Sequence, residues 1–113
     1  MAQQARYKVL VRQNGKEAVV RPPFDTADAG NNTGFVLVNR TAKDILVSLP
    51  PGVFDFNNDN LADPADVVTV GPGATRTIHV AGNAALGLGS FQIFCLETFS
   101  FAQANSDPEF IIE

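Results

Sequence analysis

Two side chains in this sequence, Cys95 and His79, could ligate a transition metal or act as a nucleophile and a base, and each is the sole residue of its type. A single cysteine excludes an intrachain disulfide. Cys95 ends an apolar run that contains Phe91 and Ile93, and no neighbouring cation activates the thiol, so we expect a small buried hydrophobe. His79 alternates with apolar neighbours, so we expect it on the solvated face of a strand, with a ligand-binding role as the alternative.

The remaining candidate catalytic groups do not form a recognisable constellation. The single histidine is accompanied by no Gly-x-Ser-x-Gly elbow, so no nucleophilic triad is predicted. The glycines between Gly82 and Gly89 precede no lysine that could pair with a phosphate. Paired carboxylates occur only in an aspartate-rich stretch, without an apolar pocket to separate their roles. We therefore expect no enzyme activity and no cofactor.

The aspartate-rich stretch, residues 55–66, is the one candidate metal site. It places oxygen side chains at positions 1, 3, 5, 9 and 12 of a twelve-residue frame, which resembles calcium loops of the EF-hand type, because calcium takes six to eight oxygen ligands. Position 6 is Asn60 where such loops have glycine, and a strand follows where they have a helix. A surface loop rich in turn-forming residues is the alternative. The candidate calcium ligands are Asp55, Asn57, Asp59, Asp63 and Asp66.

Composition limits the class of protein that these residues can serve. The chain has 113 residues, 45% of them hydrophobic and 18% charged, which predicts one packed domain over residues 1–113. The net charge of −4 disfavours binding to nucleic acid. No apolar run is long enough to span a membrane.

The apolar pattern predicts strands almost throughout. Short apolar or alternating runs are bounded by Gly, Pro, Asn and Asp, which favours an all-β fold, an antiparallel Greek-key β-sandwich of seven to eight strands. Residues 24–34 are expected to form a polar loop, and helical turns are expected only at 61–65 or 83–88. The predicted strands are 7–11, 18–20, 35–39, 45–49, 67–70, 75–80, 90–96 and 109–112.

The order of these runs resembles a known family. Val67–Val80, hinged at Gly71-Pro-Gly73, is followed by Gly89-Ser-Phe-Gln-Ile-Phe-Cys95, as in the C-terminal half of the cupredoxins of plastocyanin type. The resemblance covers residues 35–113 and implies a cupredoxin-like sandwich. Cupredoxin relatives are commonly exported, whereas Met1–Lys8 lacks the apolar segment of a secretory signal, so the compartment stays open.

In the cupredoxins the cysteine ligates copper together with two histidines and a methionine. The resemblance places the first histidine near Lys43 or Asp44, and the remaining two ligands at Thr98 and Gln103. A blue copper site needs two imidazoles and a thiolate. Because the chain has one histidine, the expectation is a cupredoxin-like domain that has lost its copper, and a copper electron carrier is the weaker alternative.

The phenylalanines suggest where a partner would bind. The segment Phe91–Leu96 is apolar on both sides of its strand, and Phe99 and Phe101 follow it, while Phe54 and Phe56 flank the aspartate-rich stretch. An apolar outer face is covered either by a loop of the same chain or by a partner. We expect a non-catalytic binding or structural module that uses this strand or the tips near Phe54 and Phe56, through a protein partner or self-association. A calcium-binding module is the alternative.

Overall fold

The computed structural model describes residues 5–12, 17–21, 24–27, 34–57, 59–102 and 109–112. The described residues contain strands and turns and no helix, so the helical turns expected at 61–65 or 83–88 are not found. None of them forms a helix that could cross a membrane. The strands are β1 (Ala5–Arg12), β2 (Glu17–Arg21), β3 (Phe24–Ala27), β4 (Gly34–Asn39), β5 (Ile45–Leu49), β6 (Phe54–Asp55), β7 (Asp66–Val70), β8 (Thr75–Val80), β9 (Gly87–Ser90), β10 (Gln92–Cys95), β11 (Ser100–Phe101) and β12 (Glu109–Ile112).

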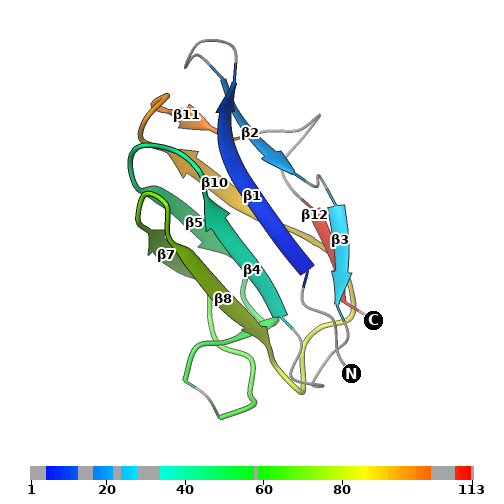
Figure 1. Ribbon diagram of the computed structural model, residues 1–113. Helices are drawn as coiled ribbons and strands as arrows, with labels where there is room; N and C mark the ends of the chain where they lie inside the picture. The colour runs from blue at the N-terminus through cyan, green and yellow to red at the C-terminus, as the bar shows by residue number, and fades with distance from the viewer. Residues whose placement is uncertain are drawn as a thin grey trace.

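These strands form three sheets. The larger two have the orders β2-β1-β4-β8-β6 and β11-β10-β5-β7, and they face each other as the layers of a sandwich (Figure 1). A smaller sheet of order β3-β12-β9 closes one side. Parallel pairing joins β1 to β4 and β12 to β3, so the sandwich is mixed rather than wholly antiparallel as expected. Parallel neighbours need long connections, and here β2 and β3 lie between β1 and β4 in the chain.

Most of the predicted strands are confirmed, several to the residue. The runs 45–49, 75–80 and 109–112 are strands with those bounds, and β1 and β2 pair as the predicted hairpin. Its turn lies outside the described residues. Two of the strand predictions were wrong. Residues 24–27, expected in a loop, form β3, because parallel pairing with β12 supplies backbone hydrogen bonds that no local pattern announces.

The second wrong prediction is a single strand over 90–96. This segment divides at Phe91, because β9 pairs with β12 whereas β10 pairs with β5 and β11. The chain therefore passes from the small sheet to the four-stranded sheet within one residue. Together with the short β3, β6 and β11, this division raises the strand number among the described residues to twelve, above the expected seven or eight.

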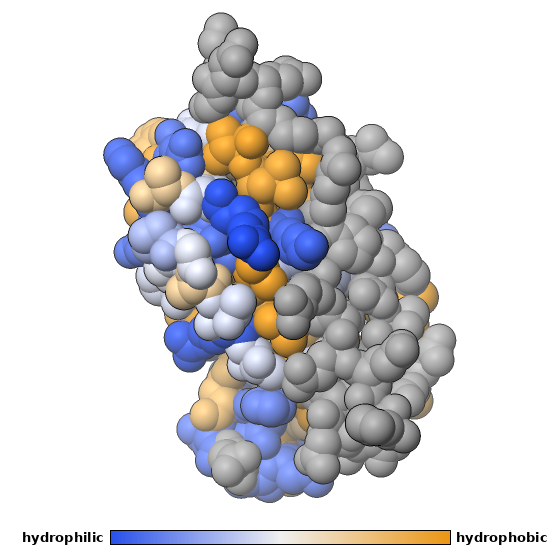
Figure 2. All heavy atoms as spheres, viewed as in Figure 1, coloured by the Kyte–Doolittle hydropathy of each residue, from blue (hydrophilic) through white to orange (hydrophobic). Residues whose placement is uncertain are grey.

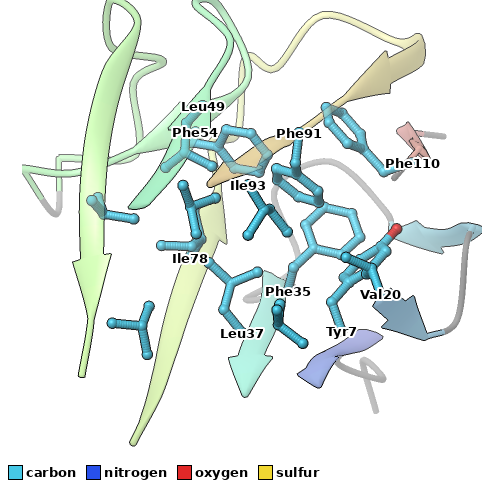
Figure 3. Packing of buried hydrophobic residues seen from close by; sticks show 14 of the residues in the cluster. Tyr7, Val20, Phe35, Leu37, Leu49, Phe54, Ile78, Phe91, Ile93 and Phe110 are labelled. Carbon is cyan, nitrogen blue, oxygen red and sulfur yellow. The ribbon is translucent and has the colours of Figure 1, made fainter. Parts of the chain in front are cut away.

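An aromatic cluster fills the space between the sheets (Figure 3). Tyr7, Phe35, Phe54, Phe91 and Phe110 are at most 1% exposed, and neighbouring rings lie 4.9–6.0 Å apart, mostly tilted or edge to face. Such ring pairs add about 0.5–1.5 kcal/mol each beyond the area they bury. They come from strands or loops spread along the whole chain, so the core depends on residues far apart in sequence.

The buried Tyr7 hydroxyl donates a hydrogen bond to the carbonyl oxygen of Glu109. A phenolic hydroxyl inside a core requires such a partner. Without one, the folded state would be destabilised by the energy lost when the hydroxyl leaves water. The bond ties β1 to β12, which are separated by 102 positions in the sequence.

Candidate functional site

The end of the sandwich that carries Cys95 is the place where the cupredoxin resemblance puts a metal. Cys95 is the last residue of β10 and is fully buried among apolar residues, as expected. The N–H of Leu96 donates to the carbonyl oxygen of Asp44 at 3.3 Å, so the two chain segments of the resemblance do meet. The side chains of Lys43 and Asp44 are exposed, whereas the thiol points into the core.

The loop between β4 and β5 is organised by a buried amide whose structural role was not predicted from the sequence. Asn39 is 0% exposed. Its Nδ2 donates to the carbonyl oxygens of Lys43 at 2.8 Å and Val70 at 2.9 Å. Its Oδ1 accepts from the N–H and the hydroxyl of Thr41 at 2.9 and 2.7 Å. The amide therefore joins the 40–44 loop to the end of β7. An asparagine that ends a buried apolar strand was the available signal.

The other positions implied by the resemblance offer no set of soft ligands. The hydroxyl of Thr98 lies 2.8 Å from that of Ser100. Gln103 lies outside the described residues. His79 is exposed, as expected, and pairs with Gly34 at the start of β4, whereas the Cys95 end adjoins Asn39 at the end of that strand. Five residues of antiparallel strand span about 17 Å. The structure thus places the thiol and the imidazole at opposite ends of the sandwich.

The aspartate-rich loop brings together three of its five candidate ligands. Carboxylate oxygens of Asp55, Asp59 and Asp63 lie within 4.8 Å of one another. Asp66 is not in this group, because it begins β7 and its Oδ1 accepts from the N–H of Val67. Asn57 turns its Nδ2 toward the Oδ1 of Asp63, at 3.0 Å, so the amide donates here rather than offering an oxygen.

The same carboxylates bind the backbone of the loop. Asp55 accepts from the N–H groups of Asn57, Asp59 and Asn60 at 3.1, 3.3 and 2.8 Å, and Asp63 accepts from the N–H of Phe56 at 2.6 Å. Asn60 has φ of 63°, the left-handed conformation that an asparagine tolerates better than most residues. The loop is therefore held by its own aspartates, whether or not a cation joins them.

An aromatic cluster lies on the outer side of the four-stranded sheet. Phe94, on β10, contacts Phe99 and Phe101 edge to face, with ring centroids 5.3 and 5.2 Å apart. Phe99 is 79% exposed and Phe101 is 53% exposed. Phe99 has φ of 50°, a conformation that a bulky residue adopts only with strain. We call Phe94, Phe99 and Phe101 the outer aromatic cluster.

The cluster continues as an apolar row across the sheet. The strand register places Phe101, Phe94, Leu46 and Thr69 side by side, and Val67 lies two residues from Thr69 on the same face. By contrast, the outer face of the five-stranded sheet carries exposed Lys8 and hydrophilic side chains that divide its apolar area (Figure 2). The outer face of the four-stranded sheet thus carries one apolar row that leads to the outer aromatic cluster.

The expectation that Phe54 and Phe56 lie at exposed tips was wrong for Phe54. Phe54 is 0% exposed and belongs to the core, because β6 pairs with β8 and turns that ring inward. Phe56 is half-buried and packs against the core. Among the described phenylalanine side chains, the outer aromatic cluster holds the only two exposed ones, Phe99 and Phe101.

One shallow hollow lies beside the small sheet, lined by Leu88, Gly89, Ser90 and Glu109. Ser90 and Glu109 are register partners across β9 and β12. The hollow offers a hydroxyl and a carboxylate but no imidazole, since His79 lies on β8. Its lining residues therefore provide no nucleophile with a histidine base.

Comparison with known proteins supports the fold and no more than the fold. No family model matches the sequence, and no curated protein matches it. A solved structure, the McoA multicopper oxidase from the hyperthermophile Aquifex aeolicus, is similar with a TM-score of 0.53 and 13% sequence identity over 99% of this chain. The match spans only 29% of the length of that oxidase. Together with the mixed sandwich described above, this similarity shows that the chain has a cupredoxin-like β-sandwich fold.

Proposed function

We propose that this chain is a non-catalytic binding module, a cupredoxin-like sandwich without a copper centre that recognises a protein partner through its outer aromatic cluster. The observation that carries the proposal is the exposure of Phe99 and Phe101 around Phe94. Exposed apolar area costs about 25 cal/mol per Å² relative to burial. Aromatic residues dominate the energetics of protein interfaces, so this cluster has the composition of an interface centre.

The chemistry of the remaining residues favours binding over catalysis. Cys95 is buried and stands apart from His79, so neither can activate the other. Asp55 and Asp63 hold a loop, and the hollow beside β9 has no base of the histidine type. The similar oxidase is an enzyme by its name, but the two chains share 13% identity, which supports a shared fold and no transfer of activity.

Replacing the exposed rings tests the aromatic proposal. The experiment cross-links the protein to its partner in an extract of its source cells. Phe99→Ser and Phe101→Ser should each reduce the amount of cross-linked partner by about tenfold. Loss of a central aromatic contact commonly costs about 1–2 kcal/mol or more of binding free energy. Leu86→Ser is the matched control, because Leu86 is 71% exposed but lies outside the cluster. Circular dichroism checks that every variant keeps its fold.

Sedimentation velocity separates self-association from a foreign partner. If the purified chain associates with itself and Phe99→Ser abolishes this association, the partner is a second copy of the chain. A set of cross-linked proteins that is identical for the parent, Leu86→Ser and both phenylalanine variants would contradict the proposal.

A calcium-binding module is the second candidate, favoured by the convergence of Asp55, Asp59 and Asp63 within 4.8 Å. A cation that binds only the folded state raises the melting temperature as its concentration exceeds the dissociation constant. If calcium binds here, millimolar calcium should raise the calorimetric transition relative to chelator, and Asp59→Ala should remove the increase. Asp44→Ala, which deletes an exposed carboxylate elsewhere, should retain it. An unchanged transition in the parent protein would leave the loop with a purely structural role.

A further inference from the structure

Strand β7 is the outermost strand of the four-stranded sheet on the side opposite the outer aromatic cluster. Within the described part of the chain it pairs only with β5, and it lies at the margin of the molecule in Figure 1. An edge strand presents a row of backbone N–H and C=O groups that another strand can bind. The edge of β7 is therefore a candidate site for strand addition.

Apart from Asp66 at its first position, β7 lacks the devices that usually protect an edge. Between Asp66 and Gly71 it reads Val-Val-Thr-Val, with no charge, proline or glycine. All four residues are β-branched and favour extended backbone. Val67 is 57% exposed and Thr69 is exposed, whereas Val68 and Val70 are buried in the core. The other outer strand of this sheet, β11, has only two residues, so β7 is the longer free edge.

The two ends of β7 differ in charge. Its first residue is Asp66, and Asp63 precedes it by three positions. The Nδ2 of Asn39 donates both to the carbonyl oxygen of the last residue of β7, Val70, and to that of Lys43. The 40–44 loop therefore lies against that end of β7. That loop and the start of β8 carry three exposed cations, Arg40, Lys43 and Arg76, against the carboxylates of Asp44 and of Glu97, which accepts from the N–H of Ala42.

We propose that β7 pairs in antiparallel register with β7 of a second copy of this chain, centred on Val68. In this register Val67 lies opposite Thr69 of the partner subunit, and two exposed β-branched side chains cover each other on the outer face. Asp66 lies opposite Val70 of the partner subunit, next to its more basic end, and the two copies of Asp66 lie at opposite ends of the pairing. Antiparallel self-pairing therefore matches unlike charges, and the two sheets join into one.

This interface uses Val67 and Thr69 at the far end of the apolar row, whereas the proposed binding surface is the outer aromatic cluster over β10 and β11. Five paired residues on each side bury much less than the roughly 1,200 Å² typical of stable interfaces. The dimer is accordingly weak, visible at high protein concentration, and weakened further by salt because unlike charges meet at both ends.

A pair of variants tests the register. Val67→Lys/Thr69→Lys places like charges directly opposite each other across the two-fold axis and should weaken the dimer by about tenfold in sedimentation equilibrium. Val67→Lys/Thr69→Glu places a lysine opposite a glutamate of the second copy and should restore association to the parent level or above. Both positions are exposed, so the monomer fold should be unchanged by circular dichroism.

One control keeps the outcome specific. Thr77→Lys/His79→Lys adds lysines to the exposed face of the other sheet, away from the start of β8, and should leave association unchanged. A parent chain that stays monomeric at millimolar concentration would overturn the inference, as would a double-lysine variant that dimerises like the parent. Association lost in Phe99→Ser but kept in the double-lysine variant would also overturn it, and would assign self-association to the outer aromatic cluster.

Discussion

Asn39 shows how a single side chain can position loops that the strands alone leave free. Its amide is fully buried and makes four hydrogen bonds, two as donor and two as acceptor. A buried amide is stable only when its donors and acceptors are satisfied in this way. Polar contacts around one residue thus fix the end of the sandwich near Cys95.

Asn39→Asp isolates the donor half of this network. The carboxylate can still accept from Thr41, but the carbonyl oxygens of Lys43 and Val70 lose the amide as a donor, and that of Lys43 keeps the hydroxyl of Thr41 at 2.8 Å. We expect the free energy of unfolding to fall by about 1–3 kcal/mol, because a buried group that loses its partner costs about that much. Urea denaturation measures the change. Asn83→Asp is the matched control, since exposed Asn83 uses its Oδ1 to accept from Ala62 and keeps that acceptor. Equal midpoints for the two variants would show that the network is dispensable.

At the level of individual residues, the sequence predicted the burial or exposure of a side chain better than the residues that it contacts. The burial of Cys95 and the exposure of His79 follow from strand alternation and were predicted. The inward turn of Phe54 was not, because it depends on pairing of β6 with β8, a strand of only two residues with no periodicity to read. The convergence of Asp55, Asp59 and Asp63 was predicted from their spacing, whereas the separation of Asp66 depends on where β7 begins.

Among the elements, the passage from β9 to β10 shows a glycine required by packing. A Cβ atom on Gly89 would lie 2.3 Å from Cζ of Phe110. Phe110 is 1% exposed and its ring contacts those of Phe35, Phe54 and Phe91. The absence of a side chain at position 89 therefore lets β9 lie against β12 while that ring fills the core.

Gly89→Ala should consequently destabilise the fold. The Phe110 ring cannot move without displacing its aromatic neighbours, so we expect a loss of about 1–3 kcal/mol, typical of overpacking. Thermal and urea denaturation measure it. Gly71→Ala is the control, because its Cβ would meet only Oδ1 of Asp44 at 3.8 Å, an ordinary contact. A Gly89→Ala protein as stable as Gly71→Ala would show that the core can repack around the methyl group.

Which strands the sequence predicted depends on how much of their signal is local. β5 and β8 alternate between buried and more exposed residues, and both were predicted with their observed bounds. β3 and the division of 90–96 at Phe91 were missed, because both depend on pairing with β12 at the far end of the chain. Local patterns do not contain that information.

On the scale of the whole molecule, the distance between its two ends bears on copper. Cys95 and His79 belong to opposite ends of the sandwich, about 17 Å apart along β4 at the rise of an antiparallel strand. A blue copper site needs a thiolate and two imidazoles on one ion. We expect that adding copper(II) to the monomer produces no intense thiolate-to-copper absorption in the visible range. A blue species at one copper per chain would contradict this expectation.

The tie between Tyr7 and Glu109, and the place of the Phe110 ring among the core aromatics, have a consequence for the order in which the chain can fold. During synthesis β1 leaves the ribosome before β12, and the partner of its buried hydroxyl is made 102 residues later. Until then the rings of Phe35, Phe54 and Phe91 lack the Phe110 ring as a neighbour. Contacts between distant residues slow folding because the intervening chain must be closed first. A nascent chain that has not yet reached β12 therefore exposes an unfinished core, which closes only as β12 docks.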